Sequence, residues 1–478
     1  MDFPAVIWQV VGHYAVASLA DLELLSRAGL RSVLDHPLAL AHAPLEFRTY
    51  QEAAAYISKK VLGGVRKLTL ESTCSQALAH LAASAPNLQE LDLGQCDNLR
   101  QLTALTCFRR LHTLQMRNCN HCTKFYRGLR ELTMFQCSPI EGDLGNLQKL
   151  KLNGCVVNHI SHMSPTLSSL DLHNTSWVDR LDKMTVWGYE GGWMPDQLHE
   201  LESLQELKLA HCEFVTNAFA RSIGHLKRLR SLTIHGCSLT DFAFIAELPN
   251  LQDLDVDHAF DWTVFRSASL RTLTLPCQDL SNLAMLKSQK ELRMLRLRWH
   301  NAMFLLGPDL SAELGQLLPC VPNLHTLDLS YWGEMQGLPV CPSVRFLAVD
   351  GCTIWDHNFA TLAKSFPNLH TLSMAYTNIT NAGLKLVPLS VRHLRIRGCN
   401  ITDSGVHALG KLPQLHGLDI SGCDVVRVVL SKTVKLLALG NNLHLEQSHL
   451  LALRRRRVKI VNTEQFQTTL EHLTKSSF

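Results

Sequence analysis

Fifteen cysteines make thiol chemistry the first possibility that this sequence raises. A thiol can serve as a nucleophile or as a metal ligand, and CNHC at 119–122 has the C-x-x-C spacing of zinc and redox sites. No second paired motif lies near it in the sequence, so a four-ligand zinc site is not predicted. Cys119 also occupies a position that recurs along the chain, and this recurrence favours a structural role.

Carboxylates also alternate along one short segment, where Asp253, Asp255 and Asp257 could bind a cation. Three carboxylates on one strand lie in a line, whereas a hard cation needs six or more oxygens around a point. The sequence contains no H-E-x-x-H, G-x-S-x-G or P-loop motif, and no pattern places a nucleophile beside a base. We therefore expect no enzymatic activity, no metal and no cofactor.

A nine-residue pattern, apolar-x-x-Leu-x-apolar-x-x-Cys, accounts for most of the cysteines. It reads LRSLTIHGC at 229–237 and VRHLRIRGC at 391–399. Seventeen copies, including variants, occur between residues 65 and 442 at spacings of 18 to 37 residues. Nine copies end in cysteine, and three of the others end in Thr or Asn: Cys96, Cys119, Cys137, Cys155, Cys212, Cys237, Cys352, Cys399 and Cys423, with Thr175, Thr377 and Asn442.

The pattern predicts a fold. In each Leu-x-Leu the two leucines point to the same side of a short strand, because side chains alternate with period two. One strand cannot bury that side alone, so stacked copies would share a parallel sheet and a continuous core. The ninth side chain would satisfy backbone groups buried at the turn, which a thiol can do as a weak donor. We predict an α/β solenoid with about 17 strands and helical ends.

The repeat resembles the cysteine-containing type of leucine-rich repeat over residues 65–442, which implies a curved, horseshoe-like solenoid. We assign 63–442 to the repeats, with insertions near 176–200 and 300–320, and 443–478 to a C-terminal cap. Copies at 111–167 are too short to hold a return helix. In the cap, VKIV is predicted to be an edge strand and TEQFQTTLEHL a final helix over the open core.

The third, fifth and seventh residues of each copy should face the concave side. Acids and bases alternate there, which is typical of a surface that recognises proteins and argues against a track for a phosphate backbone. The first insertion is rich in tryptophan and glycine, and could contact a partner or cover the edge of its own coil. The candidate partner-binding residues are Trp187, Trp193, Asp253, Asp255, Asp257, Arg296, Arg298, Trp299, Tyr331, Tyr376, Arg395 and Arg397.

Residues 1–62 precede the repeats and show helical spacing of apolar residues. Residues 3–45 resemble an F-box, the helical module that docks onto the Skp1 adaptor of cullin ubiquitin ligases; the match lies in Phe3-Pro4, Val10-Val11, Asp21-Leu22 and LLSR at 24–27. The aromatic that the family has after this SR is absent. The resemblance implies a non-catalytic substrate receptor whose adaptor contacts would be Phe3, Pro4, Val10, Val11, Leu22 and Leu25.

Other features leave alternatives open. Residues 1–62 could simply be a cap for the first coil, and the chain could be a structural scaffold of a large assembly, such as a cytoskeletal or axonemal complex. The 46 basic and 42 acidic residues give a net charge of +4, too small to imply a nucleic-acid partner. No run of 18 apolar residues and no basic start to an export signal occurs, so we expect an intracellular, cytoplasmic protein with reduced cysteines and no membrane partner.

Overall fold

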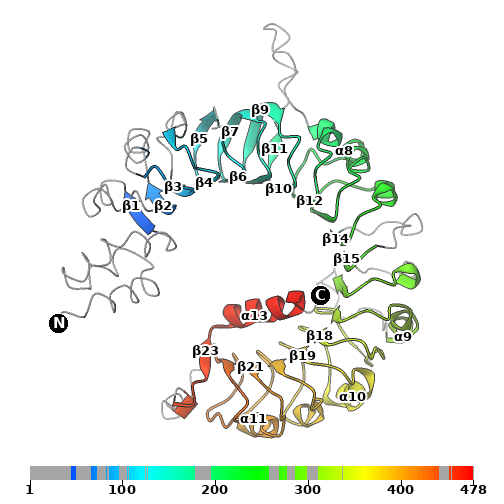
Figure 1. The fold of residues 1–478 in the computed structure, drawn as a ribbon. Coiled ribbons are helices and arrows are strands. Elements are labelled where there is room, and N and C mark those ends of the chain that lie inside the picture. The colour runs from blue at the N-terminus through cyan, green and yellow to red at the C-terminus, as the bar shows by residue number, and fades with distance from the viewer. Residues whose placement is uncertain are drawn as a thin grey trace, which may run out of the picture. The chain divides into compact units, whose positions relative to one another are not determined.

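A computed structural model forms two compact units, 1–248 and 249–478. It describes residues 45–49, 66–72, 82, 85–95, 105, 107–123, 125, 128–177, 195–257, 269–276, 286–298, 311–335, 337–440, 452–453 and 455–476. In each unit, parallel strands from successive copies of the repeat lie side by side (Figure 1).

The sheet of the first unit is parallel throughout. Leucines pair with leucines across neighbouring strands, as Leu132 does with Leu150. Its nine described strands are, in order, β1 (Leu45–Thr49), β2 (Lys67–Ser72), β3 (Glu90–Gln95), β4 (Thr113–Arg117), β6 (Glu131–Phe135), β8 (Lys149–Asn153), β10 (Ser169–His173), β12 (Glu206–Ala210) and β13 (Ser231–His235).

The second unit repeats this arrangement, with leucines again in register, as in the pair Leu372 and Leu394. Every described pairing is parallel. Its ten strands are β14 (Asp253–Val256), β15 (Thr272–Pro276), β16 (Met294–Arg298), β17 (Thr326–Asp328), β18 (Phe346–Ala348), β19 (Thr371–Ser373), β20 (His393–Arg395), β21 (Gly417–Asp419), β22 (Leu436–Ala438) and β23 (Lys459–Val461).

All seventeen predicted copies contribute a strand, so the predicted solenoid is confirmed. The described leucines at the fourth and sixth positions of the pattern are buried, and the residues between them are mostly half-buried. Removing such apolar side chains from water supplies the main stabilisation of the fold. The predicted edge strand at VKIV is β23. The strand β1 is a correction, because residues 45–49 lie in the segment that we expected to be helical and instead pair with β2.

The return segments differ along the chain. In the short copies they form a second parallel sheet, β5 (Asn120–Thr123), β7 (Ser138–Leu144), β9 (Val156–Met163) and β11 (Ser176–Trp177), because about twenty residues per coil leave no room for a helix. Longer copies return through helical turns: η3 (Pro195–Glu200), α8 (Asn217–Ile223), η4 (Ala243–Glu247), α9 (Ser311–Leu317), η7 (Leu318–Cys320), η8 (Asp356–Thr361), α10 (Leu362–Ser365), η9 (Gly383–Leu386) and α11 (Asp403–Leu409).

The last helix, α13 (Thr463–Ser476), differs in position from the expected cover on the open core. It lies across the inner face of the second unit's sheet, on the side away from the helical turns (Figure 1). Phe466 and Leu470 are buried against Ala438 and Val461. The inner face of this unit is therefore partly covered by its own chain.

Candidate protein-interaction surface

The cysteines at the ninth position are buried and bonded to backbone, as predicted. Cys399 Sγ donates to Met374 O at 3.1 Å, and Cys423 Sγ donates to Ile396 O at 3.1 Å, so each thiol reaches the preceding coil. Thr175 uses its hydroxyl in the same way, toward Leu152 O at 3.2 Å, whereas the Thr377 hydroxyl donates to Met374 O of its own coil at 2.9 Å. Cys96 and Asn442 lie outside the described residues. These side chains replace backbone partners that the sharp turn removes.

Burial also suppresses the reactivity of these thiols. It raises the pKa of Cys352 to about 12 and that of Cys212 to about 11, mainly because a buried thiolate loses its hydration. A thiol must lose its proton to act as a nucleophile or a metal ligand, so these positions are poorly suited to either role. Among the described residues, no group of three or more His, Cys, Asp or Glu side chains could hold a metal ion.

The inner face of the first unit carries exposed ion pairs between neighbouring strands. Lys149 of β8 lies 2.7 Å from Glu131 of β6, and Lys151 lies 2.8 Å from Asp171 of β10. The pKa of Lys149 is raised by its hydrogen bond to Glu131. The lysine side chains remain 60% and 45% exposed. Such pairs contribute about 0–1 kcal/mol to stability, so a partner could replace them at small cost.

The first strands of the second unit also carry ion pairs between strands on their inner face. Arg298 of β16 lies 3.6 Å from Asp255 of β14, and Arg296 lies 2.7 Å from Asp328 of β17. Asp253 and Asp257 are half-buried on the same strand segment as Asp255. Basic and acidic side chains thus neutralise one another across strands, which agrees with a mixed-charge recognition surface rather than a cation site.

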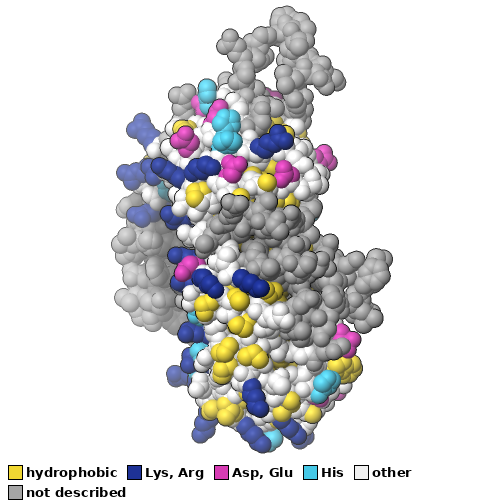
Figure 2. Space-filling view, turned by 90° about the vertical axis from the view of Figure 1, so that its right-hand side faces the viewer, with side chains coloured by type: hydrophobic (Ala, Val, Ile, Leu, Met, Phe, Trp, Pro, Cys, Tyr) yellow, Lys and Arg dark blue, Asp and Glu magenta, His cyan; other side chains and the backbone are white. Residues whose placement is uncertain are grey.

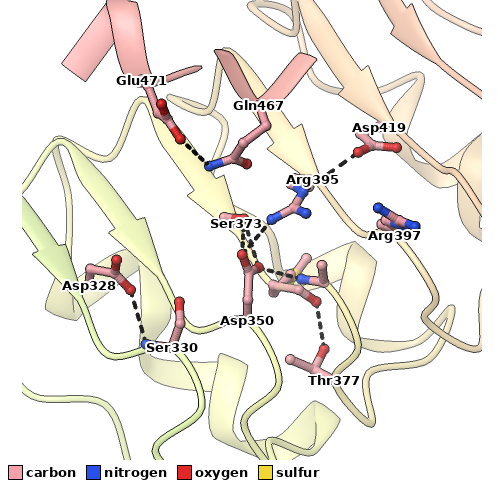
Figure 3. Close-up of polar contacts among 12 residues, drawn as sticks. Asp328, Ser330, Asp350, Ser373, Thr377, Arg395, Arg397, Asp419, Gln467 and Glu471 are labelled. Carbon is pink, nitrogen blue, oxygen red and sulfur yellow. Dashed lines mark hydrogen bonds and ion pairs between the residues drawn. The ribbon is translucent and has the colours of Figure 1, made fainter. Parts of the chain in front are cut away.

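Further along, the inner face holds a covered ionic network (Figure 3). Arg395 of β20 lies 2.6 Å from Asp350 and 3.6 Å from Asp419. Asp350 also accepts hydrogen bonds from Ser373 Oγ at 2.7 Å and from the Ala375 amide at 2.6 Å. Burial raises the pKa of both aspartates. The Arg395 side chain is only 13% exposed, so its interactions are intramolecular and differ from the open recognition role that the sequence suggested.

The residues around the site where α13 packs are uncharged, and this sequence signal was not recognised in the sequence analysis. Phe346, Gly417, Leu436 and Ala438 occupy third and fifth positions, where other copies carry charged side chains. Leu436 and Phe346 pack at the margin of the cluster around Phe466. A Cβ at Gly417 would lie 2.7 Å from His393 Cδ2 and 3.4 Å from the Phe466 ring, so glycine leaves room mainly for His393 beside that ring. An apolar interruption of a charged face thus marks where the C-terminal helix binds.

Two of the predicted aromatic residues are exposed at the turn that follows each strand. Tyr331 and Tyr376 are 65% and 50% exposed, and both have left-handed backbone conformations, with φ of 62° and 56°. Each ring lies over a glycine of the next coil, and a Cβ on Gly351 or Gly398 would come within 2.5 Å of a ring carbon. Left-handed backbone is unfavourable for tyrosine. The Arg397 guanidinium lies 5.5 Å from the centroid of the Tyr376 ring.

Several predicted site residues lie outside the described residues, so their positions remain predictions. They are Phe3, Pro4, Val10, Val11, Leu22, Leu25, Trp187, Trp193 and Trp299.

Comparison with known proteins supports the repeat. A family model described as a leucine-rich repeat matches residues 388–410. No curated protein matches the chain.

Three solved structures are similar to this chain at low sequence identity. An internalin from Listeria monocytogenes is 16% identical, with 79% of this chain and 87% of that chain covered and a TM-score of 0.31. A leucine-rich-repeat protein of Leptospira interrogans is 16% identical, with 90% and 98% covered and a TM-score of 0.38. A chain of the mouse RP105/MD-1 complex is 12% identical, with 84% and 92% covered and a TM-score of 0.44.

The repeated pattern, the parallel strands and the match to a leucine-rich-repeat model over 388–410 agree on the architecture of this chain. Its fold is a leucine-rich-repeat solenoid. Across the described parts of the chain, no helix combines the length and the apolar character needed to cross a membrane.

Proposed function

We propose that the chain is a non-catalytic adaptor that binds a partner protein on the inner face of its first unit. The observation that carries this proposal is the set of exposed cross-strand ion pairs around Lys149 and Lys151. A partner with complementary charges can exchange with these pairs, because each adds little to folding stability. In the second unit, α13 occupies part of the equivalent face, which restricts binding there to β14–β17 and the exposed turns.

The F-box resemblance suggests the larger complex in which this chain would act. On this proposal, Phe3, Pro4, Val10, Val11, Leu22 and Leu25 bind an Skp1-like adaptor of a cullin ubiquitin ligase in the cytoplasm, and the inner face presents the substrate. Trp187 and Trp193, in the first insertion, would add aromatic anchors to the contact.

Affinity purification from the source cells tests both halves of the proposal. The intact chain is compared with Pro4→Ala/Leu22→Ala, with Lys149→Glu/Lys151→Glu and with Arg221→Glu/Arg228→Glu, which makes the same charge change away from the inner face. We expect an Skp1-like protein and a cullin with every version except the first variant, and loss of a further protein only with the second.

Two results would contradict this expectation. If the lysine and arginine variants lose the same proteins, the inner face is not the binding surface. If no Skp1-like protein appears and one stoichiometric set of proteins comes down with both the intact chain and the N-terminal variant, the chain is a resident scaffold and residues 1–62 are a cap.

A further inference from the structure

A row of basic side chains runs along one edge of the second unit. In eight consecutive strands, from β15 to β22, the residue directly before the strand is Arg, His or Lys. The repeat does not demand this, because the same position in the first unit is divided between basic and uncharged residues: Arg66, His112, Arg130 and Arg230, against Gln89, Gln148, Ser168 and Gln205. The basic row consists of Arg271, Arg293, His325, Arg345, His370, Arg392, His416 and Lys435.

Backbone hydrogen bonds stack these residues one above another. The Arg345 amide donates to His325 O at 2.8 Å, the His370 amide to Arg345 O at 2.8 Å and the Arg392 amide to His370 O at 2.7 Å. The bonds continue through His416 and Lys435 at 2.7 Å and 2.8 Å. With about 4.8 Å between strands, the row is roughly 34 Å long.

Within the described part of the chain, three cations of the basic row are not neutralised by neighbouring acids. Arg345, Arg392 and Lys435 are exposed, and none of them has a carboxylate within 4.0 Å in the described part of the chain. Arg392 instead donates to the side-chain oxygen of Gln414 at 3.3 Å. On the inner face, by contrast, the arginines of β16 and β20 pair with aspartates. Lys, Arg and His side chains also follow one another along one edge of the lower part of the molecule in Figure 2.

We propose that the basic row binds an extended, acidic segment of a protein partner. This extends the proposed protein-binding function to a second surface. Arginines two strands apart, such as Arg345 and Arg392, are separated by about 10 Å, and an extended polypeptide advances about 3.3 Å per residue, so an acid at every third residue meets a cation.

The intervening histidines suit the same ligand. Burial, and then the charges of neighbouring arginines, lower the pKa of His325 and His370, so these rings are neutral at pH 7 and can donate hydrogen bonds between the cations. A nucleic-acid strand fits less well, because such binders combine a basic track with aromatic platforms for the bases. From His325 to Lys435, each residue of the basic row follows a leucine or valine, and that residue follows Asn, Ser, Gln or Thr. Neither of these two preceding positions holds an aromatic residue that could stack on a base.

Fluorescence polarisation with purified full-length chain tests the proposal. The probe is a labelled peptide of five Glu-Ser-Gly repeats, with a Gln-Ser-Gly peptide and a single-stranded oligonucleotide of equal length as competitors. We expect the Glu peptide to bind, and Arg345→Glu/Arg392→Glu to weaken binding by about tenfold or more. Lys364→Glu/Lys385→Glu, which makes the same charge change on α10 and η9, should change it by less than about twofold.

The proposal is overturned if the intact chain does not bind the Glu peptide, if the Gln peptide competes equally, if the two variants weaken binding equally, or if the oligonucleotide binds more tightly. If circular dichroism shows that the charge reversal unfolds the chain, Arg345→Gln/Arg392→Gln replaces it, with a smaller loss expected. The probe is independent of any cellular partner, so failure here leaves the inner-face proposal standing.

Discussion

Replacing Arg395 by alanine should destabilise the second unit strongly. The Asp350 side chain is 12% exposed and that of Asp419 is 0% exposed, so removing the guanidinium leaves two covered carboxylates without their counter-ion. Breaking a buried ion pair by removing one partner costs about 3–5 kcal/mol, because the other charge stays desolvated. We expect a loss in the free energy of unfolding in this range at pH 7.

The matched control is Arg298→Ala. Arg298 pairs with Asp255 on the same sheet, but the two side chains are 42% and 28% exposed and the distance is 3.6 Å. Solvent screens this pair, so its loss should cost less than about 1 kcal/mol. The assay is urea unfolding followed by circular dichroism. Equal costs for the two variants, or a cost below about 1 kcal/mol for Arg395→Ala, would refute the reasoning.

The pH dependence gives a second readout of the same variant. Burial raises the folded-state pKa of Asp350 and Asp419 above the usual value, so the fold favours their protonated forms. Their contribution to stability is therefore fully present at low pH and is lost as the pH rises through the raised pKa. Without Arg395 the pKa values rise further, so the variant's deficit should shrink between pH 7 and pH 5. A deficit that is constant over this range would show that the carboxylates are not responsible.

Three further predictions concern packing. Cys399→Ser should cost less than about 1 kcal/mol, because a hydroxyl can also donate to Met374 O, whereas Cys399→Leu should overpack the turn and cost about 1–3 kcal/mol; similar thermal melts for the two would disprove the placement. Phe466→Ala should cost about 3–5 kcal/mol and make α13 the first site of limited proteolysis, and unchanged cleavage would mean that the helix is not held by this ring. Gly398→Ala should destabilise by more than about 1 kcal/mol in the presence of Tyr376 and by less in a Tyr376→Ala background, so additive costs in this double-mutant cycle would exclude the ring contact.

The sequence was a good guide where one interaction repeats. A leucine that recurs in register has to face a shared core, and a small polar side chain at every turn has to meet buried backbone, so the strands and the placement of Cys399 followed from the pattern. The length of the copies at 111–167 excluded a return helix but did not reveal the strands β7 and β9. An irregular return segment and a short strand need similar numbers of residues, so length alone does not distinguish them.

Interactions that occur once were much harder to predict. The 3.6-residue period of α13 showed that one side of this helix is buried, but not that it binds across strands more than twenty residues away. The covered network of Arg395 depends on Asp350, which lies 45 residues earlier in the sequence. Tyr376 looked like an inner-face anchor, yet its left-handed backbone places it at the turn, where glycine occupies the equivalent position in the next coil.

The inner-face proposal is tested most directly by crosslinking mass spectrometry on the complex isolated with the intact chain. A lysine-reactive crosslinker reports which lysines lie near the partner. The account predicts partner crosslinks at Lys149, Lys151 and Lys208, which project from the inner face of the first unit. Crosslinks confined to Lys364 and Lys385, on the helical side of the second unit, with none at the three inner-face lysines, would contradict it.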